Sequence, residues 1–438
     1  MSRAAIRLDA ERGDERAEPN IRGTRMTKRV VVTGIGLVTA VGNDTPTTWQ
    51  ALCEGRSGVG PITMFDASDQ EVRIAAEVKG FDPTLYMDRK EIRRNDRFVH
   101  FATGAAKQAL SDAGFTVSDD IADDVGVIIG SGIGGLESCH DQFRVLFERG
   151  PDRISPFFIT EFITDIAAGY VSIQIGARGP NFATVSACAT GANAIGEASE
   201  MIRRGDAIAM IAGGAESAIT PIGMAAFAQM HALSRRNDDP ATASRPFDAT
   251  RDGFVMGSGA GILLLEDEEY ARKRGAHIYC ELVGYAATAD AYHITEPAPQ
   301  GAGLARAMRR AIEKAGISAS AVDYINAHGT ATVYNDRNET AAIKTVFGEH
   351  AYKLAVSSTK SMVGHTLGAA GGIEAGIAAL SITHNVMPPT INLHHPDPEC
   401  DLDYVPNQAR EAKVNVALSN SMGFGGHNAV LAFRRYNG

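Results

Sequence analysis

Residues 182–191 read Phe-Ala-Thr-Val-Ser-Ala-Cys-Ala-Thr-Gly, and the predicted fold is organised around this stretch. Its pattern is typical of a buried strand that runs into a tight turn, and residues 189–203 contain good helix formers and no proline. Cys188 therefore stands where a helix is expected to begin. Unpaired N–H groups at a helix N-terminus favour a thiolate and can bind an oxyanion. We interpret Cys188 as a candidate nucleophile, the alternative being a small buried core residue.

The composition is that of an ordinary globular protein. Of the 438 residues, 44% are hydrophobic and 21% are charged, and the net charge of −10 gives no indication of nucleic-acid binding. The five cysteines are scattered without a CxxC pair, which argues against a disulfide framework or a zinc site and favours the reducing cytoplasm. No apolar run reaches the roughly 18 residues of a spanning helix, so no membrane insertion is expected.

The first 25 residues are expected to form a disordered extension. They mix arginines with acidic residues and contain no apolar segment, which excludes a secretory signal and argues against a transit peptide. Met26 is a possible alternative start of the protein.

Strands and helices are expected to alternate after this extension, as in an α/β fold with parallel strands covered by helices. The expected strands are residues 29–41, 124–129, 206–213, 278–285, 322–327, 354–358 and 414–419. Helices are expected over residues 303–316 and 367–383. Because the order of elements is similar in both parts, we divide the chain into halves at residues 26–277 and 278–438 and infer an internal duplication.

Two histidines stand at positions comparable to that of Cys188. His328 and His365 each follow a predicted strand and lie beside glycines. Loops after the carboxyl ends of parallel strands build the sites of α/β proteins, so the three side chains are expected to converge. The alternative for each histidine is a surface or a satisfied core residue.

A basic segment lies over residues 88–97, at the expected start of a helix whose apolar stripe runs from Phe98 to Leu110. Its basic side chains are Arg89, Lys90, Arg93, Arg94 and Arg97. Helical spacing leaves most of them opposite the stripe. The segment is either a solvated face or a patch that steers an acidic partner towards an acidic protein.

Six motifs, in order, resemble those of the condensing enzymes. They are VSACATG around Cys188, RPFDATRDGFVMGSGAG from Arg245, DAYHIT from Asp290, NAHGTAT from Asn326, STKSMVGHTLGAAGGIEA from Ser358 and SNSMGFGGHN from Ser419. Within this family the chain is similar to the type II β-ketoacyl-acyl carrier protein synthases, which elongate bacterial fatty acids. The resemblance covers the chain from about Lys28 to its end. It implies a thiolase-like fold of two duplicated halves in five layers, α-β-α-β-α, and an obligate homodimer.

The resemblance implies a decarboxylative Claisen condensation that yields 3-oxoacyl-acyl carrier protein and CO2. Cys188 would accept the acyl group from its carrier's thioester, and His328 and His365 would complete the triad. After malonyl-carrier loses CO2, the two histidines would stabilise the enolate through their Nε–H groups, while the backbone N–H groups of Cys188 and Phe424 would form an oxyanion hole. No cofactor or metal is expected, because the pantetheine arm arrives on the acyl carrier protein.

Further roles are implied by the same resemblance. Lys360 and Glu374 are similar to an ion pair that supports His365, and Phe424 is similar to a gate of the acyl pocket. Substrate-binding positions are matched by Thr330 and Thr332 at the pantetheine arm, by Ile133, Phe158 of a neighbouring subunit and Phe227 at the pocket wall, and by His293 and Thr295 in the DAYHIT motif. The basic side chains of residues 88–97 become a docking patch for the acidic acyl carrier protein.

Three residues depart from the family pattern, and none of them removes a catalytic group. Glu296 stands in place of serine, Ser258 in place of an acidic residue and Val333 in place of proline. A thiolase would use a second cysteine in the loop over residues 423–427, which contains none. A chain-initiating synthase would have asparagine at position 365, and a chain-length factor would lack the active cysteine. The remaining alternative is a specialised ketosynthase of polyketide or nodulation-type acyl-chain synthesis.

Overall fold

A computed structural model describes residues 28–438, so the expected extension over residues 1–25 lies outside the described residues. The first half of the chain contains strands β1 (Val30–Val38), β2 (Gly60–Pro61), β3 (Ile74–Ala75), β4 (Val125–Gly130), β5 (Asn181–Phe182), β6 (Ala209–Glu216) and β7 (Gly259–Asp267). Its helices are α1 (Thr45–Cys53), α2 (Arg89–Ile92), α3 (Arg97–Asp112), α4 (Leu136–Arg149), α5 (Phe158–Phe162), α6 (Ile166–Ile175), α7 (Thr190–Arg204), α8 (Pro221–Gln229) and α9 (Glu268–Lys273).

The second half contains strands β8 (Cys280–Ala289), β9 (Tyr324–Asn326), β10 (Ala355–Ser357), β11 (Val386–Met387), β12 (Arg410–Glu411), β13 (Val416–Gly423) and β14 (His427–Arg434). Its helices are α10 (Ala302–Lys314), α11 (Val333–Phe347), α12 (Lys360–Val363) and α13 (Ala370–His384). Two short 3₁₀ turns, η4 (Ala187–Ala189) and η9 (Leu367–Ala369), lead directly into α7 and α13.

The two halves repeat one strand pairing. In the first, β4 lies between the parallel strands β5 and β6, and the antiparallel strands β7 and β1 follow. In the second, β9 lies between the parallel strands β10 and β13, and the antiparallel strands β14 and β8 follow. Pairing between β1 and β8 joins both into the order β10-β9-β13-β14-β8-β1-β7-β6-β4-β5. The predicted duplication is therefore present in the topology.

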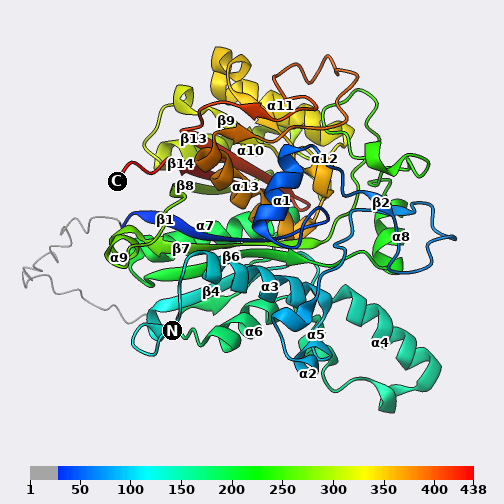
Figure 1. The fold of residues 1–438 in the computed structure, drawn as a ribbon. Coiled ribbons are helices and arrows are strands. Elements are labelled where there is room, and N and C mark those ends of the chain that lie inside the picture. Colours follow the sequence, from blue (N-terminus) through cyan, green and yellow to red (C-terminus); the bar gives the residue numbers. More distant parts are fainter. Residues whose placement is uncertain (1–27) are drawn as a thin grey trace, which may run out of the picture.

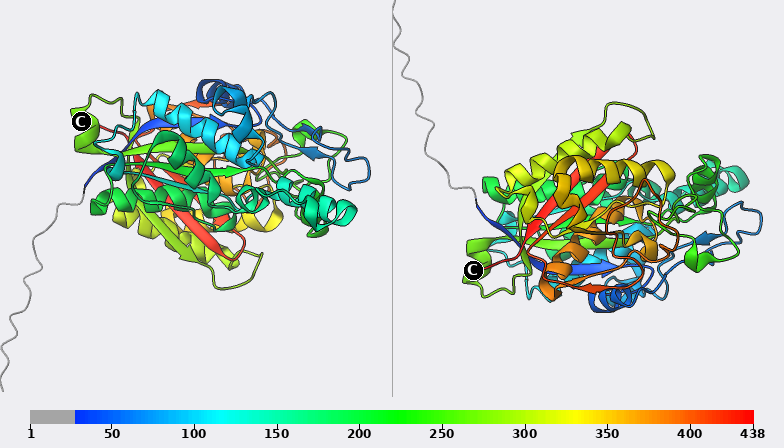
Figure 2. Two further views of the ribbon diagram at one scale, coloured as in Figure 1. Left: turned by 90° about the horizontal axis from the view of Figure 1, so that it is seen from below. Right: turned by 90° about the horizontal axis from the view of Figure 1, so that it is seen from above.

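The elements stack in five layers, as predicted. Figure 1 shows α3 and α6 below the strands of the first half, α7 and α13 between the two sets of strands, and α10 and α11 above the strands of the second half. Five layers enclose four spaces. One hydrophobic cluster fills the two inner spaces around α7 and α13, and a separate cluster fills each of the two outer spaces. Figure 2 shows from two further sides that α4 projects from this body.

Local sequence explains the central layers. The β-branched run of β1 is buried along its whole length, as expected for a strand covered on both faces. α7 and α13 approach closely because glycines face each other between them. A Cβ atom added at Gly191 would lie 2.7 Å from the backbone nitrogen of Gly372, so a larger residue would force the two helices apart.

Three expectations about local structure were wrong. The segment before Cys188 is not a buried strand, since β5 comprises two exposed residues at the edge of the sheet. The basic segment does not continue into one helix, because it forms the separate helix α2 and a turn, after which Asp96 caps α3. The last predicted strand does not end at residue 419, because β13 runs to Gly423 and turns directly into β14.

No helix among residues 28–438 has the length and apolar character needed to cross a membrane.

Candidate active site

Cys188 lies in the 3₁₀ turn that precedes α7, one residue after a strained position. Ala187 has a φ of +50°, a left-handed conformation that is uncommon for alanine. Side chains hold this turn from both ends, since Ser186 donates its N–H to the Thr190 hydroxyl at 2.9 Å and Asn193 donates to the Ser186 hydroxyl at 2.6 Å. Cys188 is 8% exposed and lines a cavity.

The two predicted histidines come from the second half, one after a strand and one after a short helix. His328 follows β9, and its N–H donates to the Glu339 carboxylate at 2.9 Å, as the N–H of Gly329 does at 2.8 Å. His365 follows α12, and its N–H donates to the Val255 carbonyl at 2.7 Å. Each histidine is thus fixed through its backbone, which leaves the ring free to face the cavity.

The structure brings Cys188, His328 and His365 together around one cavity of about 370 Å³. The imidazole centroids of the two histidines are 5.3 Å apart and their planes are nearly perpendicular, at 87°. Other lining residues include Phe227, Phe254, Thr295, Glu296, Thr330, Thr332, Leu367 and Phe424. The predicted convergence of the three side chains is therefore present in the fold, although Cys188 lies in a 3₁₀ turn and His365 follows helix α12 rather than a strand.

Burial and one lysine set the charge state of both histidines. Burial lowers the pKa of His328 and of His365 well below the ordinary value, and the nearby positive charge of Lys360 lowers both further. Both rings are consequently neutral near pH 7. Their Nδ1 atoms are buried without a hydrogen-bond partner in the described chain.

The thiol of Cys188 differs from the expectation of a thiolate at a helix terminus. Burial raises its pKa to about 12, although the charge of Lys360 and a hydrogen bond from the N–H of Phe424 both act to lower it. Desolvation thus outweighs these two contributions, and the free site holds a protonated thiol.

Lys360 and Glu374 form a buried ion pair behind the histidines, each with a side chain 2% exposed. Burial raises the pKa of Glu374 to about 7 against the opposing charge of Lys360. The lysine charge acts on Cys188, His328 and His365 together rather than on His365 alone.

The remaining predicted substrate residues divide into two groups. Phe227, Thr295, Thr330, Thr332 and Phe424 line the cavity. The others do not line it: Ile133 packs against the hydrophobic cluster that contains Cys188, Phe158 contacts Phe162 on α5, and His293 is exposed and accepts from the N–H groups of Thr295 and Glu296.

The basic segment is less uniform than its sequence indicates. Arg97 pairs with Glu137 through two hydrogen bonds of 3.0 and 3.1 Å, and Arg94 lies 4.4 Å from the centroid of the Phe157 ring. Arg89, Lys90 and Arg93 are exposed and form no ion pair within residues 28–438.

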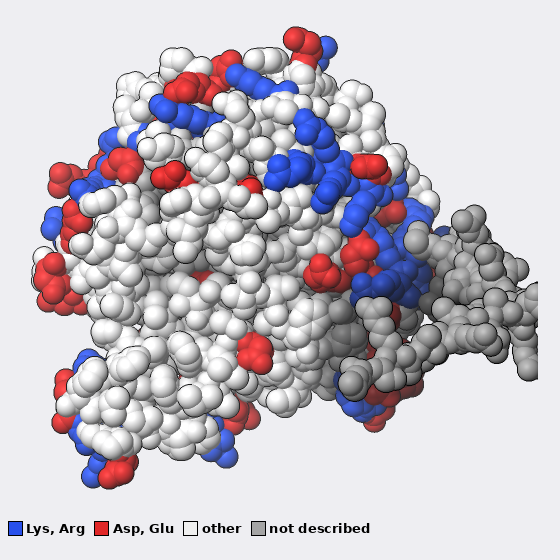
Figure 3. All heavy atoms as spheres, turned by 180° about the vertical axis from the view of Figure 1, so that it is seen from behind, with Lys and Arg blue, Asp and Glu red and all other residues white. Residues whose placement is uncertain are grey.

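Positive charge is not confined to this segment. Figure 3 shows Lys and Arg side chains gathered in a band on the face opposite the view of Figure 1. The exposed side of α10 carries Arg306, Arg309, Arg310 and Lys314, and none of the four forms an ion pair with a described residue. Exposed charge alone therefore does not single out a docking site.

The three residues that depart from the family pattern differ in how deeply they are buried. Glu296 is exposed and lines the cavity, and Val333 is 38% exposed at the start of α11. Ser258 is buried away from the cavity, where its hydroxyl accepts from the N–H of Val78 at 3.1 Å. Of the three departures, Glu296 is the one that places a charged side chain in the cavity lining.

Sequence reasoning missed the residue that organises the loops around the site. Glu216 ends β6, is fully buried and accepts from the Ser131 hydroxyl and from the N–H groups of Gly132, Ile133 and Gly368. Its available signal was a carboxylate at the end of a continuous apolar strand, where a charge requires partners. Burial raises its pKa to about 7 despite these hydrogen bonds.

Comparison with known proteins agrees with this site. The chain matches the family models described as beta-ketoacyl synthase, N-terminal domain, over residues 27–271, and beta-ketoacyl synthase, C-terminal domain, over residues 279–394. A 3-oxoacyl-acyl-carrier-protein synthase 2 of Synechocystis sp. is 58% identical over 409 residues, which is 93% of this chain and 98% of the relative. A synthase of the same name from Staphylococcus aureus is 54% identical over 93% of this chain and 99% of the relative.

Solved structures give the same result at lower identity. A beta-ketoacyl synthase from Burkholderia phymatum is 39% identical and superposes with a TM-score of 0.87, covering 94% of this chain and 100% of the other. A polyketide acyl-carrier protein in complex with its ketosynthase, bound to the hexaketide, gives 36% identity, a TM-score of 0.87 and the same coverage. The chain belongs to the β-ketoacyl synthase family.

Proposed function

We propose that this protein condenses an acyl group held on Cys188 with malonyl-acyl carrier protein, giving 3-oxoacyl-acyl carrier protein and CO2 in fatty-acid elongation. The observation that carries the proposal is the meeting of Cys188, His328 and His365 around one cavity, in a chain that is 54–58% identical to 3-oxoacyl-acyl-carrier-protein synthases 2.

In the first stage, the sulfur of Cys188 attacks the thioester carbonyl of the acyl carrier. A new thioester forms on Cys188 while the bond to the pantetheine sulfur breaks, and the thiol proton ends on the released pantetheine thiol. The N–H groups of Cys188 and Phe424 stabilise the negative oxygen that forms during the attack. The hydrogen bond from Phe424 to Cys188 supports this role, because it places the donor beside the reacting sulfur.

In the second stage, malonyl-carrier loses CO2 and the resulting enolate attacks the acyl-cysteine carbonyl. His328 and His365 stabilise the enolate oxygen as neutral donors, each hydrogen bond lowering the barrier by roughly 3 kcal/mol. Their tautomer follows from burial. Both Nδ1 atoms lack partners in the described chain, and a bare lone pair is tolerated better in the interior than a bare N–H, so the proton belongs on Nε2.

The cavity supplies places for both parts of the substrate. Thr330 and Thr332, whose hydroxyl oxygens are 3.0 Å apart, bind the pantetheine arm on the side of the His328 strand end. Phe227 forms part of the wall for the acyl chain, Ile133 packs against the hydrophobic cluster that contains Cys188, and Phe424 closes the cavity from the β13–β14 turn. The resident side chains carry the whole reaction, with pantetheine entering as part of the substrate.

The exposed charges of Arg89, Lys90 and Arg93 dock the acidic acyl carrier protein. Arg93→Glu should raise the carrier KM by roughly tenfold at low salt and much less at high salt, because exposed charges are screened. Arg310→Glu on α10 is the matched control, since it makes the same charge change at an exposed position outside the proposed docking patch. Equal effects of both variants, or no effect of either, would contradict docking at α2.

Apolar surface at the edge of the first half supports a homodimer. β5 leaves one side of its backbone unpaired in the described chain, and large side chains near it are exposed: Ile159 by 63%, Ile173 by 76%, Phe182 by 38% and Val185 by 56%. A partner covering this surface would place the α5 region with Phe158 near its neighbour's acyl pocket. Light scattering should give a dimeric mass for the wild type and a monomeric mass for Val185→Asp.

Synthesis of specialised acyl chains is less well supported. The polyketide ketosynthase structure is 36% identical to this chain and the structure of the ishigamide ketosynthase/chain length factor is 35% identical, whereas the 3-oxoacyl-acyl-carrier-protein synthases 2 reach 54–58%. A panel of acyl carriers of graded length decides between them. Turnover of plain saturated chains is expected, and turnover restricted to oxygenated or branched chains would contradict a role in elongation.

A further inference from the structure

We infer that Arg251 is a positioning residue that holds Thr330 and Thr332 in place for the pantetheine arm, an inference that rests on the proposed function. Arg251 is not in the cavity lining, and its side chain is 1% exposed. A guanidinium so deeply buried requires nearly all of its donors to be used.

Arg251 donates hydrogen bonds to backbone carbonyls of the threonine segment, residues 330–333. Its Nε donates to the Thr332 carbonyl at 3.2 Å, and one Nη2 hydrogen goes to the Val333 carbonyl at 3.2 Å. These carbonyls immediately follow the strained residue Ala331, whose φ of +67° is in the left-handed region. The conformation that presents both threonine hydroxyls to the cavity is uncommon for alanine and depends on such external contacts.

Two carboxylates fix the guanidinium itself. Asp397 accepts from Nη1 of Arg251 at 2.7 Å, and Asp336 lies 3.4 Å from its Nε. Asp336 also accepts from the N–H of Phe247 at 2.8 Å and from the N–H of Ala331. One guanidinium thus faces two carboxylates, and the segment from Ala331 to Val333 is bound by both Arg251 and Asp336.

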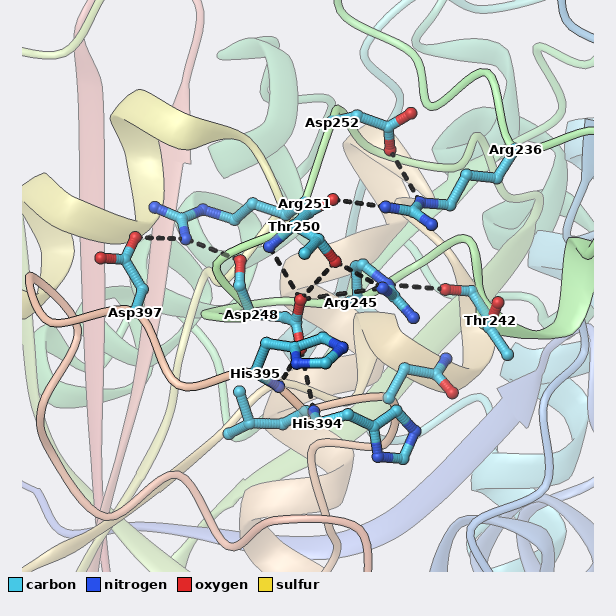
Figure 4. A network of polar contacts seen from close by, with 12 residues as sticks. Arg236, Thr242, Arg245, Asp248, Thr250, Arg251, Asp252, His394, His395 and Asp397 are labelled. Atoms are coloured by element: carbon cyan, nitrogen blue, oxygen red, sulfur yellow. Dashed lines mark hydrogen bonds and ion pairs between the residues drawn. The ribbon is translucent and has the colours of Figure 1, made fainter.

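A neighbouring arginine makes a matched comparison possible. Figure 4 shows Arg245 and Arg251 extending from the same loop in different directions, Arg251 towards Asp397 and Arg245 towards Thr242. Arg245 is also buried, and it donates to the Thr242 carbonyl at 3.0 Å and to the Thr250 hydroxyl at 2.6 Å. It makes no hydrogen bond to the threonine segment. If the arginines of this loop only stabilised the fold, replacing either of them should affect pantetheine binding equally.

The test compares Arg251→Lys with Arg245→Lys in the full-length protein. The probe is octanoyl-pantetheine, and transfer of its acyl group to Cys188 is followed by mass spectrometry. Lysine keeps the charge but lacks the planar fork that reaches two carbonyls and a carboxylate at once. Because displacements near 1 Å can cost about 100-fold, Arg251→Lys is expected to raise the KM for octanoyl-pantetheine at least about tenfold. Arg245→Lys is expected to change it by less than about threefold.

Alkylation of Cys188 by iodoacetamide, a reagent without a pantetheine arm, separates positioning from general damage. Its rate should stay within about twofold of wild type in both variants, since neither arginine contacts the thiol and the effects of distant sites are largely independent. Equal KM changes in the two variants, or a parallel loss of alkylation in Arg251→Lys, would overturn the inference.

Asp397→Asn provides a second route if Arg251→Lys does not fold. It keeps the size of the side chain but loosens the guanidinium, so it should raise the same KM while alkylation persists. An unchanged KM in Asp397→Asn would overturn the inference. A wild type that alkylates but takes no acyl group would overturn the proposed function and the inference with it, whereas normal wild-type acylation with unchanged KM in the variants would overturn the inference alone.

Discussion

The starts of α7 and α13 are equivalent positions in the two halves, and they differ in what faces them. Each 15-residue helix follows a three-residue 3₁₀ turn that opens on a left-handed residue, Ala187 with φ +50° or Leu367 with φ +48°. The second residue of each turn is Cys188 in the first half and Gly368 in the second. Duplication thus provides two helix starts that can attract negative charge.

The carboxylate of Glu216 occupies the start of α13. It accepts from the N–H of Gly368 at 3.0 Å and from that of Gly132 at 2.7 Å, which ties this helix start to the loop of the acyl pocket. The start of α7 carries no such internal carboxylate among the described hydrogen bonds and faces the cavity through Cys188. The start of α13 therefore binds a structural carboxylate, whereas the start of α7 is left to bind the oxygen of a substrate.

The largest expected effect is the loss of the nucleophile at the α7 start. Cys188→Ala should lower condensation by about 10⁴-fold or more, because the acyl group has no covalent acceptor. Cys139→Ala on α4 serves as control and should retain wild-type turnover. The measurement is 3-oxoacyl product formed from acyl and malonyl carriers, and appreciable turnover in Cys188→Ala would show that the α7 start is not the reactive one.

The α13 start should instead be sensitive to size. A Cβ atom at Gly368 would lie 2.3 Å from the nitrogen of Gly132 and 2.7 Å from Oε2 of Glu216, so Gly368→Ala should destabilise the fold by about 3 kcal/mol. Gly169→Ala on α6, where a Cβ atom meets nothing within 4 Å, should be neutral or stabilise by up to about 1 kcal/mol. Urea unfolding measures both, and equal stabilities would contradict the tight packing at α13.

The charge state of Cys188 tests how strongly the N–H groups at the α7 start lower the pKa of its thiol. Since burial raises the thiol pKa to about 12, the thiolate fraction should grow about tenfold for each pH unit between about pH 7 and pH 9. The rate of iodoacetamide alkylation at Cys188 should rise by the same factor. A plateau near neutral pH would mean that the helix start outweighs desolvation.

The smallest effect concerns the charge at the α13 start. Burial raises the pKa of Glu216 to about 7, so the folded state holds an additional proton above the ordinary carboxyl pKa, and stability falls as pH rises towards 7. Glu216→Gln removes this titration. Between about pH 6 and pH 8, the wild type should therefore lose about 1 kcal/mol of unfolding free energy relative to Glu216→Gln. Glu374 titrates in both proteins and cancels, so a constant difference would contradict the raised pKa of Glu216.

Features that depend on a local stretch of sequence could be predicted. The duplication, the buried strands and the placement of Cys188, His328 and His365 beside glycines were all predictable from element order and motifs. The exposed edge strand β5 was not, because Phe182 within it and Val185 just after it have the apolar character of core residues although they are 38% and 56% exposed. Apolar pattern alone does not distinguish a core from a surface that a partner covers.

Residues that act through distant contacts were also beyond prediction. Glu216 meets Gly368 and Arg251 meets Asp397 only after the two halves have packed, across 152 and 146 positions of sequence. The thiol pKa of Cys188 was misjudged for a related reason. A helix start is visible in the sequence, whereas the desolvation that raises the thiol pKa depends on the whole surrounding cluster.

Mass spectrometry of the intact protein after incubation with an acyl carrier tests the central claim most directly. A mass increase equal to the acyl group is predicted, located on the peptide that contains Cys188 and removed by subsequent addition of malonyl-carrier. His365→Ala should keep this adduct but fail to discharge it, because the enolate loses a donor. An unmodified Cys188 in the wild type, or an adduct on another residue, would contradict the account.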